Sequence, residues 1–131
     1  MAVSGMNHFT ILTDDVEATI AFYREFLDLG PGARPPFKFP GAWLYAEGGR
    51  GPDPILHVIG GVDKQRLVKG VIDHMAFTGK DLAGLVARLQ RNSIAYELRK
   101  QVGSGTWQLF FDDPNGAKVE IDFDPAEAAP A

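Results

Sequence analysis

The feature that most constrains this chain of 131 residues is a weak internal repeat. Residues 7–29 contain an alternating apolar run followed by apolar residues at helical spacing, and residues 73–94 repeat this order. An offset of 66 residues aligns the two stretches and places His8 on His74. One copy of such a unit is too small to bury its apolar face alone, so a repeat predicts two units built on the same plan.

The start of each predicted helix carries a capping signal. Asp15 and Asp81 stand at equivalent positions, and an aspartate side chain at the N-cap accepts hydrogen bonds from free backbone N–H groups. An apolar stripe at helical spacing follows each aspartate. Its members are Val16, Ile20, Phe22, Tyr23, Phe26 and Leu27 in the first copy, and Leu82, Leu85, Val86 and Leu89 in the second.

The later strands of the two copies also align. Residues 43–45 match residues 109–111 at the same offset, and residues 55–59 match residues 118–122 at an offset of 63, because the first turn segment is about three residues longer. Each copy therefore reads as strand, helix and three further strands, an α+β fold of two βαβββ modules.

The predicted boundaries follow from this repeat. The modules are predicted at residues 6–60 and 71–123 of one domain, with a linker at 61–70 and a mobile tail at 124–131.

All three histidines of the protein, and Glu120, fall at equivalent places in the repeat. His8 and His74 open the first strand of each copy, and His57 and Glu120 lie in the last strand. If the four strands come together, the side chains can converge on a divalent Zn, Ni, Fe or Mn ion, for which imidazole nitrogens and a carboxylate are suitable ligands. The chain has no cysteine, so a transition-metal site must use these residue types.

Each of these residues also has an ordinary structural explanation. A single histidine in a strand is often half-buried and satisfied by backbone groups, which applies to His8, His57 and His74. Glu120 alternates with Lys118 and Asp122, as on the solvated face of a strand. The metal prediction rests on the equivalence of the four positions in the repeat.

Two segments carry a resemblance to a known superfamily. His8 with residues 15–23, and residues 108–116 followed by Glu120, resemble the opening and closing elements of vicinal-oxygen-chelate proteins. This superfamily includes glyoxalases, bleomycin-resistance proteins and extradiol dioxygenases. The resemblance implies a cupped, incompletely closed eight-stranded mixed sheet. It also implies metal ligands from the first and last strands of each module, which correspond to His8, His57, His74 and Glu120.

Residues 34–44 and 55–57 are similar to the glyoxalase-I-like branch, with two departures. Glyoxalase I usually has a carboxylate or glutamine at the position of His57, and an arginine that helps to hold glutathione at the position of Leu12. The resemblance implies metal-dependent lyase or isomerase chemistry on a small molecule with vicinal oxygens. Glu120, with His57 as its partner, is the candidate for moving the proton.

Two alternative functions remain open at this stage. One is an extradiol-type dioxygenase, with Fe(II) held by His8, His74 and Glu120, because two histidines and one carboxylate suit non-haem iron. The other is a protein of the bleomycin-resistance type, which sequesters a drug or metabolite without chemistry. A metal assay separates the last alternative from the other two.

Other residues are candidates for the substrate pocket. Aromatic side chains can line an apolar cup, although most aromatics in a small domain pack in the core. These candidates are Phe37, Phe39, Trp43, Trp107 and Phe110. Arg34, Arg99 and Lys100 are candidates to meet a substrate carboxylate.

The overall composition bears on partners and location. A net charge of −4 disfavours nucleic acid, and the sequence contains no stretch that approaches the ~20 apolar residues of a membrane span. The N-terminal residues lack a signal-peptide pattern, so we expect a cytoplasmic protein. Two helices cannot cover both faces of eight strands, which predicts a homodimer.

Overall fold

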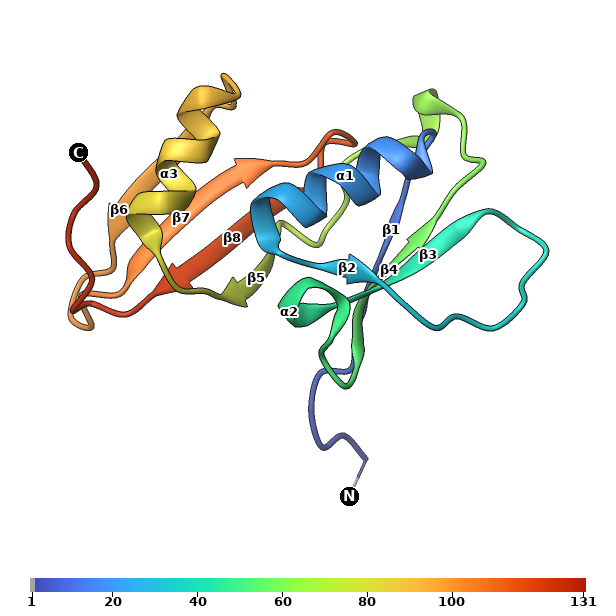
Figure 1. Ribbon diagram of the computed structural model, residues 1–131, viewed down its shortest axis with the longest axis horizontal. Helices are drawn as coiled ribbons and strands as arrows, with labels where there is room; N and C mark the ends of the chain where they lie inside the picture. The colour runs from blue at the N-terminus through green and yellow to red at the C-terminus, as the bar shows by residue number, and fades with distance from the viewer. Residues whose placement is uncertain (1) are drawn as a thin grey trace. The chain divides into compact units, whose positions relative to one another are not determined.

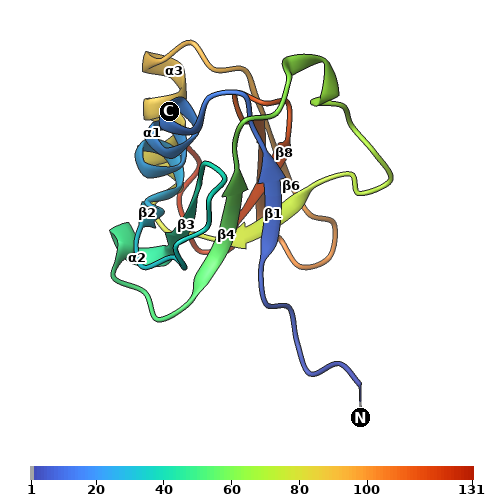
Figure 2. The same cartoon turned by 90° about the vertical axis from the view of Figure 1, so that its right-hand side faces the viewer.

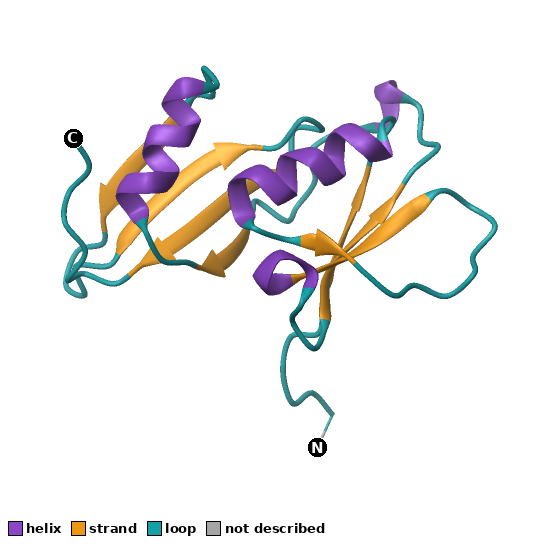
Figure 3. Ribbon diagram, in the orientation of Figure 1, coloured by secondary structure: helices purple, strands orange, loops and turns teal. Residues whose placement is uncertain are grey.

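The computed structural model describes residues 2–131 and consists of two compact units. The division falls between Val68 and Lys69, within the segment predicted as the linker. Figure 3 shows strands and a long helix in each unit. The unit that ends at Val68 is called unit 1 below, and the unit that begins at Lys69 is called unit 2.

Unit 1 is a four-stranded mixed sheet with one long helix (Figure 1). Its strands lie in the order β1-β4-β3-β2, with β1 parallel to β4 and the other neighbours antiparallel. The elements of this unit are β1 (Phe9–Leu12), α1 (Val16–Leu27), β2 (Gly30–Pro31), β3 (Gly41–Tyr45), the short α2 (Ala46–Gly49), β4 (Pro54–Ile59) and the 3₁₀ turn η1 (Lys64–Arg66).

Unit 2 has the same plan. Its strands lie in the order β5-β8-β7-β6, with β5 parallel to β8 and the other neighbours antiparallel. The elements are β5 (Met75–Thr78), α3 (Leu82–Arg91), β6 (Tyr96–Lys100), β7 (Trp107–Asp112) and β8 (Lys118–Phe123). The identical order and directions confirm the predicted repeat and the α+β class, with backbone pairing in two four-stranded sheets.

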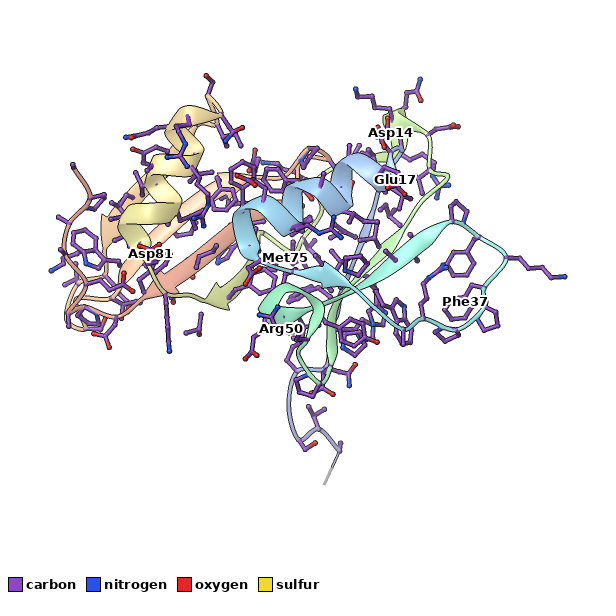
Figure 4. The ribbon with its side chains drawn as sticks, in the orientation of Figure 1. Asp14, Glu17, Phe37, Arg50, Met75 and Asp81 are labelled. Carbon is purple, nitrogen blue, oxygen red and sulfur yellow. The ribbon has the colours of Figure 1, made fainter. Side chains whose placement is uncertain are left out.

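Both long helices begin where the capping signals predicted. The Asp15 side chain accepts from Ala18 N–H, and the Asp81 side chain accepts from Gly84 N–H. Figure 4 shows Asp81 at the start of α3. A side-chain oxygen at this position satisfies a backbone donor that the helix itself leaves free.

In each unit the helix covers one face of the sheet, and the core lies between them (Figures 1 and 2). Leu56 and Val58 of β4 are buried on the covered face of unit 1, and Val119 and Ile121 of β8 on that of unit 2. Because neighbouring residues of a strand point to opposite faces, His57 and Glu120 lie on the face turned away from the helix. This side of each sheet is called the open face.

One part of the predicted alignment is wrong by one residue. Trp43 pairs with His57, whereas the partner of Glu120 in the adjacent strand is Phe110 rather than Leu109. A shift of one residue exchanges the faces of a strand. The alternation did not fix the register because residues 109–111 are apolar and buried throughout, so that β7 lacks a polar side.

The chain end predicted as a mobile tail has contacts with unit 2. Leu82 N–H donates to the Glu127 carboxylate at 2.7 Å, and the Trp107 indole N–H donates to the Glu127 carbonyl at 3.0 Å. Glu127 thus satisfies one of the free N–H groups at the start of α3. Between residues 2 and 131, no helix is both long and apolar enough to cross a membrane.

Candidate metal centre

The open face of unit 1 brings two of the predicted metal ligands together. His8 directly precedes β1, and His57 lies in β4, the strand parallel to β1. Their rings stack with centroids 3.7 Å apart and an interplanar angle of 12°. Trp43, opposite His57 on β3, stacks on the other side of the His57 ring at 4.2 Å. Three strands therefore supply a column of three parallel rings.

The Nε2 atom of His57 is suited to metal binding. His57 Nε2 is buried and has no hydrogen-bond partner in the structure. Burial is the main cause that lowers the pKa of His57, and the charge of His8 lowers it further, whereas a hydrogen bond with the Pro54 backbone opposes both. A neutral imidazole with an unshared lone pair is the form that binds a metal.

The open face of unit 2 holds the other pair. His74 directly precedes β5, and Glu120 lies on the parallel strand β8. His74 Nε2 is 3.6 Å from Glu120 Oε1, and the Glu120 side chain is only 8% exposed. This burial rules out the solvated strand face that was the alternative for Glu120.

The surroundings of Glu120 favour its protonated form. Burial raises the pKa of its carboxyl group most, followed by the hydrogen bond with Asp122 and the charge of Asp122. The positive charges of His74 and Arg99 lower this pKa and only partly offset the increase. A buried carboxylate needs a cation beside it, and a divalent ion would supply one.

A tight turn holds the strand that carries Glu120. Asp113 Oδ1 accepts from the N–H groups of Asn115 and Ala117, both at 2.8 Å. Gly116 has a φ of +89°, a conformation that glycine adopts without strain. The Asp-Pro-Asn-Gly sequence therefore forms the β7–β8 hairpin that fixes the position of β8.

The predicted ligands thus occur as two pairs, one in each unit. No group of three or more potential ligand residues gathers at a single point within residues 2–131. Each pair joins the residue before the first strand to a residue of the parallel last strand. The positions predicted to be equivalent therefore correspond between the units: His8 corresponds to His74, and His57 corresponds to Glu120.

The predicted pocket residues do not share one environment. Trp43 and Phe110 lie on the open faces, directly opposite His57 and Glu120. Phe37 and Phe39 lie on the loop between β2 and β3, where their rings stack and each is 43% exposed (Figure 4). Trp107 alternates with Phe110 along β7 and binds Glu127, so it points to the side opposite the candidate ligands.

The three basic candidates pack against aromatic rings. The Arg34 guanidinium lies 5.1 Å from the ring centroids of both Phe37 and Phe39. Arg99 lies over Phe110 at 4.4 Å, and Lys100 lies over Trp107 at 4.7 Å. Of these three basic residues, Arg99 is the one whose charge lowers the pKa of Glu120.

Sequence reasoning missed several polar neighbours of the ligands. Asn7 and Asp73 bind the Nδ1 atoms of His8 and His74 at 2.6 and 2.8 Å. Gln108 approaches Glu120 at 3.5 Å from the neighbouring strand. A signal was present for the first two, since an acceptor side chain precedes the histidine in both copies of the repeat.

Comparisons with known proteins show the family to which the chain belongs. The chain matches the model of the Glyoxalase/Bleomycin resistance protein/Dioxygenase superfamily over residues 5–121. It is 28% identical over 127 residues to glyoxylase I 4 of Arabidopsis thaliana, a match that covers 91% of this chain and 70% of that protein.

Solved structures share the fold at low identity. A mutant of the fosfomycin resistance protein FosX from Listeria monocytogenes, complexed with Mn(II) and 1S,2S-dihydroxypropylphosphonic acid, has a TM-score of 0.72 and 15% identity, with 93% of each chain covered. A glyoxylase/bleomycin resistance protein/dioxygenase domain from Frankia sp. EAN1pec has a TM-score of 0.71 and 20% identity, covering 97% of this chain and 96% of that one.

Proposed function

Because the chain belongs to the Glyoxalase/Bleomycin resistance protein/Dioxygenase superfamily, we propose that it is a metal-dependent enzyme that acts on a small molecule with vicinal oxygens. The chemistry we propose is of the glyoxalase-I-like lyase or isomerase type. The candidate metal ligands in this proposal are the His8–His57 pair of unit 1 and the His74–Glu120 pair of unit 2.

The observation that carries the proposal is the state of the donor atoms. His57 Nε2 is buried without a partner, and the buried Glu120 carboxyl group lies 3.6 Å from His74 Nε2. Buried polar groups are normally satisfied, so such atoms call for an explanation. A divalent ion would accept the imidazole lone pairs and neutralise the carboxylate.

The residues have distinct roles in this proposal. When bound, the metal supplies a positive charge that stabilises an oxyanion developing on the substrate. Glu120 takes the substrate proton and returns it to another atom, a role that suits a carboxyl group with a raised pKa. Trp43 and Phe110, opposite His57 and Glu120, keep water from the open faces beside the ligands.

Leu12 and His57 depart from the glyoxalase I pattern, and both departures bear on which class of substrate the site accepts. Leu12 is 39% exposed on β1 and offers no charge to the carboxylates of glutathione. His57 supplies a neutral nitrogen in place of a carboxylate or amide oxygen. The substrate screen must therefore extend beyond glutathione adducts.

The test is metal reconstitution followed by a substrate screen. The chelator-stripped protein is titrated with Zn²⁺, Ni²⁺, Mn²⁺ and Fe²⁺, and each form is assayed with the methylglyoxal–glutathione adduct, catechols and epoxide antibiotics. We expect one metal per chain and metal-dependent turnover. A protein that binds no divalent metal but retains a small molecule tightly would refute the proposal in favour of sequestration, and ring cleavage of a catechol would favour the dioxygenase.

A further inference from the structure

The side chain that precedes each open-face histidine bonds to its ring. We propose that Asn7 and Asp73 are positioning residues that set the tautomer and orientation of His8 and His74 for metal binding. This inference rests on the metal site proposed above and adds two residues to it. Neither touches the donor atom itself, so each acts through the histidine beside it.

In both units the preceding side chain contacts the same ring nitrogen of the histidine, Nδ1. Asn7 Oδ1 lies 2.6 Å from His8 Nδ1, and Asp73 Oδ2 lies 2.8 Å from His74 Nδ1. An amide oxygen and a carboxylate oxygen accept hydrogen bonds, so this arrangement fits the tautomer with the proton on Nδ1 in both rings. The lone pair is then left on Nε2, and in unit 2 this is the atom that faces Glu120 Oε1 at 3.6 Å.

A hydrogen bond to the second ring nitrogen is usual for histidines that bind a metal. A histidine ligand generally donates its second ring N–H to a carboxylate or carbonyl oxygen, which fixes the tautomer and makes the ligating nitrogen more basic. Asn7 and Asp73 provide such an oxygen to His8 and His74. Both histidines are therefore set to present Nε2 to a metal.

The repeat provides a second, independent line of support. Asn7 and Asp73 are separated by the same 66 residues as His8 and His74, although the two modules share little other sequence. The two residues differ in charge but share a short side chain with an acceptor oxygen. What both positions retain is the ability to accept from Nδ1.

Asp73 has an additional partner. Lys118 Nζ donates to Asp73 Oδ2 at 3.1 Å, and Lys118 lies on β8 two residues before Glu120. The lysine ties the Asp73 carboxylate to the strand that carries the other candidate ligand. Because a charged acceptor binds an N–H more strongly than a neutral one, we expect Asp73 to matter more than Asn7.

The experiment compares Asn7→Ala, Asp73→Ala and Asp73→Asn with the wild-type chain. Metal-free protein is titrated with Mn²⁺, and free Mn²⁺ is counted by electron paramagnetic resonance. Removal of an outer partner typically weakens metal binding by about 10–100-fold, so we expect Asp73→Ala near the upper end and Asn7→Ala near the lower end. Asp73→Asn keeps an acceptor oxygen and should recover part of the loss.

A second readout needs no metal. Ring ¹⁵N spectra of the metal-free protein at mildly alkaline pH report which nitrogen of each neutral imidazole is protonated. We expect the Nδ1–H form for His8 and His74 in the wild-type chain, and a shift of the His74 proton toward Nε2 in Asp73→Ala. The matched control is Asp112→Ala, which removes an exposed carboxylate of unit 2 that pairs with Lys69 at 4.0 Å.

The outcomes separate the two proposals. If the wild-type chain binds Mn²⁺ and the variants bind it equally well with unchanged tautomers, Asn7 and Asp73 have no positioning role. If the wild-type chain binds neither Mn²⁺ nor the other divalent ions, the proposed function itself fails, and this inference with it. Selective loss in the Asn7 and Asp73 variants, but not in the control, supports both.

Discussion

Glu120 combines a strand position with surroundings that do not suit an isolated carboxylate. Its side chain is 8% exposed, and Asp122, two residues further along β8, adds a second negative charge. Charges of the same sign close together in a poorly solvated place raise the free energy of the ionised form. The residue is therefore sensitive to the presence or absence of a cation.

We predict that Glu120→Gln lowers metal content and turnover together while the fold is retained. Glutamine preserves the size of the side chain, but a neutral amide oxygen is a poorer ligand for a divalent ion. The measurement is elemental analysis, with thermal melts taken with and without chelator. Bound metal should raise the melting temperature of the wild-type chain, and the variant should lose this increase.

Asp112→Asn is the control, since Asp112 is an exposed carboxylate on the neighbouring strand. A surface change of this kind typically alters the free energy of unfolding by less than about 0.5 kcal/mol. Equal metal content and equal chelator sensitivity in Glu120→Gln and the wild-type chain would contradict the role assigned to Glu120.

The pKa of His57 predicts a pH dependence of stability in the metal-free protein. Burial lowers this pKa below the usual 6.5, so the unfolded chain takes up a proton that the folded chain resists. The contribution of His57 to the free energy of unfolding is present above about pH 6.5 and declines as the pH falls below that value. His57→Gln should flatten this decline.

The measurement is the urea midpoint of both proteins in chelator, from neutral to mildly acidic pH. Glu120 contributes with the opposite sign, because a raised carboxyl pKa adds stability as the pH falls toward the ordinary value of 4.5. This contribution is common to both proteins and cancels in the difference. Midpoints that fall in parallel would show that His57 does not cause the pH dependence.

At the scale of elements, the β7–β8 turn decides where Glu120 lies. The Asp113 carboxylate is 5% exposed and accepts two backbone N–H groups. We predict that Asp113→Ala lowers the free energy of unfolding by about 1–3 kcal/mol, the usual cost of leaving buried donors unsatisfied. Chemical denaturation measures this loss, and Asp14→Ala, at an exposed position beside the start of α1 (Figure 4), is the control.

An effect of Asp113→Ala no larger than that of Asp14→Ala would show that the turn forms without the carboxylate. If the variant folds, its metal affinity should also fall, because β8 carries Glu120 after this turn. Loss of stability with unchanged metal affinity would mean that β8 keeps its place by its pairing with β5 and β7 alone.

The elements also show what the sequence could and could not predict. The helices and the order of the strands were predictable because the caps Asp15 and Asp81 and the apolar spacing are local signals. The register of β7 was not, because its apolar residues lie on both faces. The contacts of Asn7 and Asp73 with the histidine rings depend on side-chain geometry, which strand periodicity does not encode, and only their equivalent positions in the repeat gave a signal.

The sequence also did not determine on which face of its strand each aromatic residue lies. Trp43 and Phe110 were predicted on aromatic character, and their registers opposite His57 and Glu120 came from the structure. Trp107 has the same chemistry but the opposite parity on β7, so its indole meets Glu127 of the chain end. Residue type alone cannot distinguish the two faces of a strand.

At the scale of the whole molecule, the exposed apolar residues near the unit boundary bear on assembly. Each unit uses one long helix to cover one face of its sheet. Apolar side chains close in sequence to the unit boundary are exposed, including Val68 at 79% and Ile72 at 68%. Such side chains gain free energy when a second chain covers them, at roughly 25 cal/mol per Å² of apolar surface removed from water.

We predict that the chain forms a homodimer, because closed twofold pairing is the commonest way for identical chains to bury complementary surfaces. Light scattering coupled to size exclusion should give about twice the 14.3 kDa of one chain at micromolar concentration. Ile72→Asp places a charge at an exposed apolar position and should shift the equilibrium toward monomer. Lys64→Asp, on the η1 turn, is the control, because it changes charge without removing an apolar side chain. A monomer throughout the micromolar range would refute the dimer. A dimer that Ile72→Asp leaves intact would show that the chains meet elsewhere, and the open faces would then be the surfaces to test next.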